Sequence, residues 1–289
     1  MAGFTLTSMP TANWRSVAYG NGVFVAIANG TVAGTSTDGV TWTARTLPNA
    51  AWQCVAFGNG LFVAVAYNTA TYATSTNGIT WTSRTLPYNQ LFNSVTYGNG
   101  RFIICGDSPW TLNSTTGTSS WNLAAGSGGS YWPGVCYGTD FVGVQRTLNG
   151  VSQVSANGTS WTAYSMPDSE GWESVAYGNG VYVAISADAL AAVSTDGATW
   201  SGHTCPFNLR WVAFGSGVFV AVGPGVAAVS TDGITWVESA TDGPSWYRVG
   251  FGTADLFAIV PSSGTVSGIY DSTAADEFWT ANVIATETF

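Results

Sequence analysis

The sequence predicts an all-β fold made of seven copies of one four-stranded unit, and three observations lead to this prediction. The first is a turn glycine that recurs along the chain, at Gly20, Gly58, Gly98, Gly138, Gly178, Gly215 and Gly252. The second is a tryptophan that follows each glycine by 21 to 27 residues, at Trp42, Trp81, Trp121, Trp161, Trp200, Trp236 and Trp279. The third is the β-branched and aromatic character of segments such as 23–27 and 61–65, which have strand length and no helical apolar spacing.

The first copy shows how four strands fit into one repeat. We expect the first strand to end at Tyr19, the Gly20-Asn21-Gly22 turn to supply residues of positive φ, and the second strand to run through Ile27. The third strand ends at Ser36, and the segment up to Trp42 turns the chain into the fourth strand. Four strands per repeat of ~40 residues are typical of a β-propeller blade. We therefore predict one domain, a seven-bladed β-propeller of four antiparallel strands per blade, with blades at 13–48, 51–87, 91–125, 131–167, 171–206, 209–240 and 245–285.

Two terminal segments compete to close this ring. Residues 4–10 match the fourth-strand segment 42–48, so an N-terminal strand can complete the last blade and cover its open edge. Residues 279–283 resemble a fourth strand as well. The sequence predicts closure by a terminal strand and leaves open which terminus provides it.

Composition restricts the classes of partner. Only 8% of the residues are charged, with seven arginines, no lysine and 16 acids, which gives a net charge of −9. Nucleic acids and anionic membranes are disfavoured, because both require clustered basic side chains. We also expect no secretion signal and no membrane span. Four cysteines occupy core positions of the repeat, and we expect them to be free buried thiols: Cys54, Cys105, Cys136 and Cys205. Their spacing does not match a metal site, and we expect no cofactor.

The segments that precede the repeated tryptophans resemble the Asp-box of bacterial neuraminidases. Three copies read Ser-Thr-Asp-Gly-x-Thr-Trp and contain Asp38, Asp196 and Asp232, whereas two others carry Asn77 and Asn157 at the same place. An amide can cap a turn as well as a carboxylate, but it cannot replace a catalytic acid. We therefore predict a structural role for all five residues, with hydrogen bonds to the following backbone amides.

This resemblance raises the hypothesis of a sialidase, which would need converging arginines and a pair of acids. The arginines that could converge are Arg15, Arg101, Arg210 and Arg248, but the uniform short loops leave little material for a deep pocket. Asp168, Glu170 and Glu173 could form an acid/base pair or a cation site, and a solvated acidic loop is the interpretation we favour. We predict a protein without enzymatic activity.

One position varies between blades while the scaffold repeats. It follows the aromatic residue that starts each first strand, and propeller topology places it near the mouth of the central channel: Arg15, Gln53, Asn93, Pro133, Glu173, Arg210 and Tyr247. Trp110 lies in an irregular loop outside the repeat and could stack on a sugar ring or anchor a partner. Apart from Pro133, these residues are the predicted binding residues.

The combined repeat, Trp-x-Ser-Val-Ala-Tyr-Gly-Asn-Gly followed by Ser-x-Asp-Gly-x-Thr-Trp, is similar to repeats of bacteriophage virion proteins such as tail fibres, attachment proteins and decoration proteins. The resemblance implies a structural or attachment protein located in the virion, assembled in the host cytoplasm and exposed after release. Its partners would be other virion proteins, with host surface glycans as a further ligand. A carbohydrate-binding lectin, a sialidase-like glycosidase and an intracellular assembly scaffold stay open as alternatives.

Overall fold

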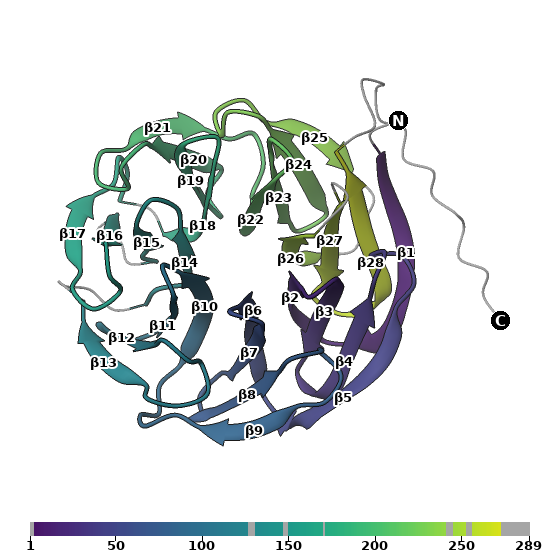
Figure 1. Cartoon of the computed structure of the whole chain (residues 1–289). Helices are drawn as coiled ribbons and strands as arrows, with labels where there is room; N and C mark the ends of the chain where they lie inside the picture. The colour runs from purple at the N-terminus through teal and green to yellow at the C-terminus, as the bar shows by residue number, and fades with distance from the viewer. Residues whose placement is uncertain are drawn as a thin grey trace.

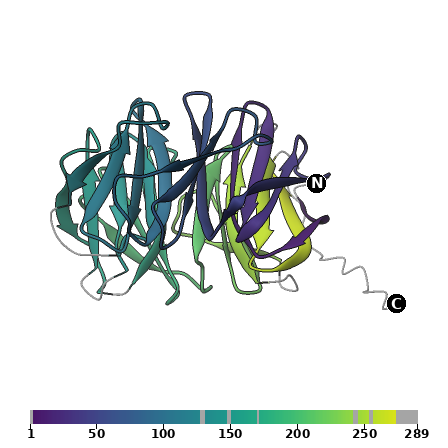
Figure 2. The ribbon, with the colours of Figure 1, turned by 90° about the horizontal axis from the view of Figure 1, so that it is seen from below.

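The protein is described from a computed structural model, over residues 3–126, 131–146, 150–169, 171–240, 245–252 and 256–272. Over these residues, 28 strands form seven antiparallel sheets of four strands, arranged as a ring around a central axis (Figure 1). Figure 2 shows the ring from the side, as a disc whose hairpins and loops lie on its two faces. The predicted seven-bladed β-propeller is confirmed.

Within each of the first six blades, the strands follow the chain from the axis to the rim. Blade 1 contains β2 (Trp14–Gly20), β3 (Val23–Ala28), β4 (Gly30–Ser36) and β5 (Thr43–Ala50). Blade 2 contains β6 (Trp52–Gly58), β7 (Leu61–Ala66), β8 (Thr71–Ser75) and β9 (Thr82–Thr85). Blade 3 contains β10 (Phe92–Gly98), β11 (Arg101–Gly106), β12 (Trp110–Ser114) and β13 (Asn122–Ala125).

The second half of the ring repeats this order. Blade 4 contains β14 (Gly134–Tyr137), β15 (Phe141–Val144), β16 (Val151–Ser155) and β17 (Thr162–Ser165). Blade 5 contains β18 (Trp172–Gly178), β19 (Val181–Ser186), β20 (Leu190–Ser194) and β21 (Ser201–Thr204). Blade 6 contains β22 (Trp211–Gly215), β23 (Val218–Gly223), β24 (Val226–Ser230) and β25 (Val237–Ala240). Blade 7 contains β26 (Trp246–Phe251), β27 (Leu256–Pro261) and β28 (Gly264–Asp271), and its fourth strand is β1 (Gly3–Ala12).

The N-terminal strand closes the ring. β1 pairs antiparallel with β28, with Leu6 opposite Gly268, and forms the outer edge of blade 7 (Figure 1). Met9 on this strand is buried in one cluster with Trp14 of blade 1, so the closing strand is also tied to the first blade. The competing segment 279–283 and Trp279 lie outside the described residues.

The seams between blades depend on an aromatic side chain that covers a glycine. A Cβ atom added at Gly20 would lie 2.0 Å from Cγ of Phe57 in the next blade, and one at Gly58 would lie 2.0 Å from Cγ of Tyr97. Real Cβ atoms do not approach other carbons this closely, so only glycine fits. Gly20 is thus the last residue of β2 and serves the seam, while Asn21 and Gly22 provide the positive φ values of the turn, 50° and 80°. The turn thus supplies residues of positive φ as expected, through Asn21 and Gly22 and not through Gly20.

Hairpin asparagines add a polar link between neighbouring blades. Nδ2 of Asn21 donates to the carbonyl of Thr76, which belongs to the Asp-box segment of the next blade, at 2.9 Å. Asn179 makes the same bond to the carbonyl of Thr231 at 3.1 Å. Together with the glycine contacts, these bonds fix the rotation of one blade relative to the next, which positions the residues at the axis.

Candidate functional site

The Asp-box residues act as turn caps in the structure. Oδ1 of Asp38 accepts hydrogen bonds from the backbone amides of Val40 and Thr41 at 2.9 and 2.7 Å. The bond from Thr41 is the main reason that the pKa of Asp38 lies below its usual value. The amide oxygen of Asn77 accepts the corresponding bonds in blade 2, also over 2.9 and 3.0 Å. A carboxylate and an amide therefore accept the same two backbone hydrogen bonds at this turn.

The other three predicted box residues have the same geometry. Backbone amides two and three residues further on donate to Oδ1 of Asn157, Asp196 and Asp232. In four of the five boxes the closing indole nitrogen donates back to the box glycine, as Trp42 does to the carbonyl of Gly39 at 2.9 Å, whereas that of Trp161 donates to the hydroxyl of Thr111. These turns follow the third strands and so lie on the face opposite the starts of the first strands. Their acids are distant from the channel mouth by topology.

The mouth of the channel holds a hollow of about 100 Å³. Its lining includes six of the seven residues at the variable position of the repeat, namely Gln53, Asn93, Pro133, Glu173, Arg210 and Tyr247. Arg15, the seventh, stacks on the ring of Tyr247 with its guanidinium carbon 5.2 Å from the ring centroid. The ring symmetry thus brings one side chain from each blade to a single place. Their role in binding stays a prediction.

Trp110 is not part of this hollow. It starts β12 in the middle of blade 3, and 43% of its surface is exposed. Its backbone amide donates to the hydroxyl of Ser108. A binding role for Trp110 would therefore require a second contact area, away from the axis.

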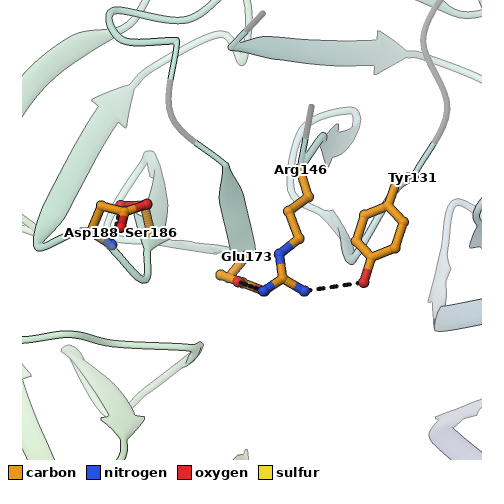
Figure 3. Close-up of polar contacts among 5 residues, drawn as sticks. All are labelled: Tyr131, Arg146, Glu173, Ser186 and Asp188. Atoms are coloured by element: carbon orange, nitrogen blue, oxygen red, sulfur yellow. Dashed lines mark hydrogen bonds and ion pairs between the residues drawn. The ribbon is translucent and has the colours of Figure 1, made fainter. Parts of the chain in front are cut away.

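An ion pair crosses one seam at the mouth. Nη2 of Arg146, which follows β15, lies 2.8 Å from Oε1 of Glu173 on β18, and Nη1 donates to the hydroxyl of Tyr131 at 3.1 Å (Figure 3). Burial raises the pKa of Glu173, and the guanidinium of Arg146 partly offsets this effect. Asp188, also drawn in Figure 3, raises the pKa of Glu173 further through its charge. The one acid that lines the hollow is thus already engaged by a cation.

Arg248 forms the floor of the hollow. It is 4% exposed, and its guanidinium carbon lies 3.6 Å from the ring centroid of Trp211. Nη1 donates to Sγ of Cys54 at 3.2 Å, and Nη2 donates to the carbonyl of Asn93 at 3.1 Å. In the described part of the chain the only ion pair is Arg146–Glu173, so this buried cation is held there by neutral partners. A buried charge without a counter-charge is costly and marks the surroundings as a place for an anion.

The local charge balance is opposite to that of the whole chain. Four of the seven arginines gather here: three line the hollow and Arg15 lies beside it. Against them stand Glu173 in the lining and two acids in its surroundings, Asp188 and Asp107. Asp107 accepts a hydrogen bond from Nδ2 of Asn93 at 2.5 Å, and burial raises its pKa. The mouth is therefore a locally positive site on a chain of net charge −9.

The other predicted catalytic groups do not assemble. Asp168 lines a separate hollow with Trp172 and His203, apart from Glu173, and Glu170 lies outside the described residues. Arg101 lies at the hairpin end of β11, where Nη1 donates to Oδ1 of Asn113 at 2.6 Å. The convergence of four arginines considered from the sequence is thus wrong for Arg101, because β11 starts on the face opposite the mouth.

The described residues give no support for a nucleophilic cysteine or for a metal site. The four cysteines are free thiols, three of them buried, and burial raises the pKa of Cys205, which follows the lone histidine by two residues. Among the described residues no group of three or more His, Cys, Asp or Glu side chains could hold a metal ion. No helix in the described ranges has the length and apolar character needed to span a membrane.

Sequence reasoning did not identify Tyr131, Arg146 or Trp211 as residues of the mouth. Arg146 stands five residues after the aromatic residue of the second strand, where the other blades carry Asn29, Tyr67, Asp107, Ala187, Pro224 and Ser262. This second variable position was a signal that could have identified it. Tyr131 adopts a φ of 79°, a conformation that is uncommon for residues other than glycine and often marks a functional site.

Comparison with solved structures relates the chain to other propellers. A streptogramin B lyase superposes with a TM-score of 0.81 at 12% identity, over 92% of this chain and 97% of the lyase. YCF48 bound to a D1 peptide gives 0.75 at 14% identity, over 94% and 96% of the two chains. The WD40 domain of Doa1 gives 0.77 at 11% identity, over 94% and 98%. At these identities the similarity establishes the fold alone. No protein-family model and no curated protein matches the chain.

Proposed function

We propose that this protein is a non-enzymatic binding propeller that serves as a structural or attachment protein of a bacteriophage virion. It would dock to other virion proteins through the face that carries the hollow. The observation that carries the proposal is the convergence at the mouth of a variable repeat position, six of whose seven residues line the hollow. A surface that varies on a repeated scaffold is the usual arrangement for recognition.

The chemistry of the mouth supports binding over catalysis. A general acid or base requires a titratable group that can exchange a proton with a substrate, and Glu173 is instead held by Arg146 at 2.8 Å. The streptogramin B lyase is an enzyme on the same fold, so the fold itself does not decide between binding and catalysis. YCF48 in complex with a peptide is an example of a propeller of this fold that binds a protein segment.

The virion assignment rests on the similarity of the repeats to those of phage tail and decoration proteins. The composition agrees with it, because a lysine-free chain rich in Gly and Trp suits a particle protein that leaves the cell by lysis. The location we propose is the virion, with assembly in the host cytoplasm. Mass spectrometry of particles purified from lysates of the source strain tests this assignment. Peptides of the protein in the lysate but not in the particles would favour an intracellular assembly scaffold.

The absence of enzymatic activity is tested separately with purified protein. We expect no release of chromophore from aryl sialosides or other aryl glycosides, at any pH between 4 and 8. Turnover that the Glu173→Gln variant abolishes would overturn this part of the proposal and would favour the glycosidase alternative.

A lectin is the second candidate, and the exposure of Trp110 favours it. An indole that is 43% exposed can stack on a sugar ring. In this version the protein binds host glycans on a glycan array, and Trp110→Ala abolishes the signal. A signal that Trp110→Ala leaves unchanged would rule out this residue as the sugar platform.

A further inference from the structure

We propose that the hollow at the mouth is a receptor for a single carboxylate on a partner protein, the side chain of an Asp or Glu inserted end-on. The inference rests on the proposed docking function and names the chemistry of the contact. It follows from the charges at the mouth, from the size of the hollow and from the groups that line it.

The first step concerns the cation that is free to bind. Arg146 is held by Glu173 and Tyr131, and Arg248 is held by Cys54 and an Asn93 carbonyl. Arg210 lines the same hollow and is exposed; its charge lowers the pKa of Glu173, but the ion pair of Glu173 is made with Arg146 and not with Arg210. Its planar fork of donors matches the two oxygens of a carboxylate.

The second step concerns size. The volume of the hollow, about 100 Å³, is small for a binding pocket. Pockets for drug-sized ligands have volumes of about 300–1,000 Å³. The Arg248 side chain reaches from blade 7 to Cys54 and Asn93 of blades 2 and 3, so it crosses the channel at the hollow. A carboxylate with its adjoining methylene groups fits, whereas the ring of an acidic sugar would remain outside.

The third step concerns the walls. Three aromatic side chains line the hollow: Tyr131, Trp211 and Tyr247. Aromatic and arginine side chains around a small depression are typical of the anchor points of protein interfaces. Gln53 adds a neutral donor, since its Nε2 makes only a long contact of 3.5 Å to the hydroxyl of Tyr247.

The fourth step concerns selectivity on an acidic protein. With a net charge of −9, the chain repels acidic partners over most of its surface and attracts them at the mouth. An acidic side chain would thus be guided to one place and one orientation. This pattern favours a protein partner with a projecting acid over a broad anionic surface.

The experiment uses the full chain and small probes that represent the side chain. The probes are N-acetyl-glutamate amide, its neutral analogue N-acetyl-glutamine amide, and the methyl glycoside of sialic acid, each titrated and followed by NMR. The test variant is Arg210→Gln, and Arg45→Gln is the matched control. Arg45 has the same charge but lies on β5, where Nε donates to the hydroxyl of Thr35.

We expect the glutamate probe to bind the native chain and Arg45→Gln equally, and to bind Arg210→Gln at least about tenfold more weakly, since a charged hydrogen bond is lost. The glutamine probe should not bind. Equal binding of both probes, or equal binding to both variants, would overturn the proposal. Preference for the sialoside with the same dependence on Arg210 would also overturn it and would assign the hollow to a glycan.

These outcomes are separate from the test of the virion role. Binding of the glutamate probe by a protein absent from particles would preserve the carboxylate receptor and remove the virion assignment. A protein that is present in particles and binds none of the probes would preserve the virion assignment and remove the carboxylate receptor.

Discussion

Replacing Gly58 by alanine tests the seam between blades 2 and 3. An added Cβ would lie 2.0 Å from Cγ of Tyr97, where an ordinary carbon contact is about 3.5–4.0 Å. The ring must move by about 1.5 Å, but it already stacks on Phe102 with their centroids 4.7 Å apart. We therefore expect a cost at the upper end of that known for overpacked cores, about 3 kcal/mol in the free energy of unfolding.

The control lies two residues away on the same hairpin. Gly60 has a φ of 73° and no atom within 4 Å of an added Cβ. Alanine there pays only the left-handed backbone penalty of about 1 kcal/mol. The difference of about 2 kcal/mol between the two variants isolates the steric contact from the general effect of alanine in a turn.

The assay is equilibrium unfolding in urea, with a double-mutant cycle between Gly58→Ala and Tyr97→Ala. Removal of the ring should relieve the clash, so the double variant should be more stable than the sum of the single changes by about 2 kcal/mol. Strictly additive effects, or equal costs at Gly58 and Gly60, would refute the reasoning that aromatic-glycine contacts hold the blades together.

Three further predictions concern the box, the closing strand and the floor of the hollow. Asp38→Asn should leave the midpoint of thermal unfolding nearly unchanged at pH 7, whereas Asp38→Ala, which loses the acceptor, should cost about 1 kcal/mol. Folding lowers the pKa of Asp38, so the stability that its charge provides is present above the pKa of the unfolded state and is lost as the pH falls through the pKa of the folded state. Acid unfolding of the native chain and of Asp38→Asn, followed by circular dichroism, checks the direction of this pH dependence. Deletion of residues 1–12 should expose β28 and remove buried Met9, lowering the Tm by more than about 10 °C and causing association in size-exclusion chromatography, and a synthetic peptide of residues 1–12 should reverse both effects. Arg248→Lys should cost about 2 kcal/mol in urea unfolding, because an ammonium cannot both stack on Trp211 and reach two acceptors; an unchanged midpoint would contradict the assigned contacts.

The blades could be predicted from the sequence because each uses the same side chains in the same places. Trp14, Trp52, Trp172 and Trp246 start their first strands, Trp132 lies two residues before β14, and all five are at most 1% exposed, as expected for core positions. The closing strand could not be decided in this way, since the outer strand has a weak signature that both termini share. In the structure the decision follows from long-range contacts, the pairing of β1 with β28 and the burial of Met9 beside Trp14.

The seam glycines show where local reasoning fails. Gly20 opens the predicted turn, and the positive φ values of that turn belong to the next two residues. The requirement for glycine at this position comes from Phe57, which is 37 residues further along the chain and in another blade. A repeated motif shows that glycine is required in every copy, but it does not identify the residue of the neighbouring blade that makes glycine necessary.

At the mouth of the channel, some features could be predicted from the repeat and others could not. Topology alone predicts that the seven variable residues meet there, because identical blades must present identical positions to the axis. The charge of the site depends instead on departures from the repeat: Arg248 stands where other blades carry Ser16, Cys54 and Ser94, and it needs the equally exceptional Trp211 to cover it. The Arg248 side chain extends from blade 7 across the channel to Cys54 and Asn93 of blades 2 and 3, at the hollow that it lines. The exceptions to the repeat, and not the repeat itself, thus give the mouth its charge.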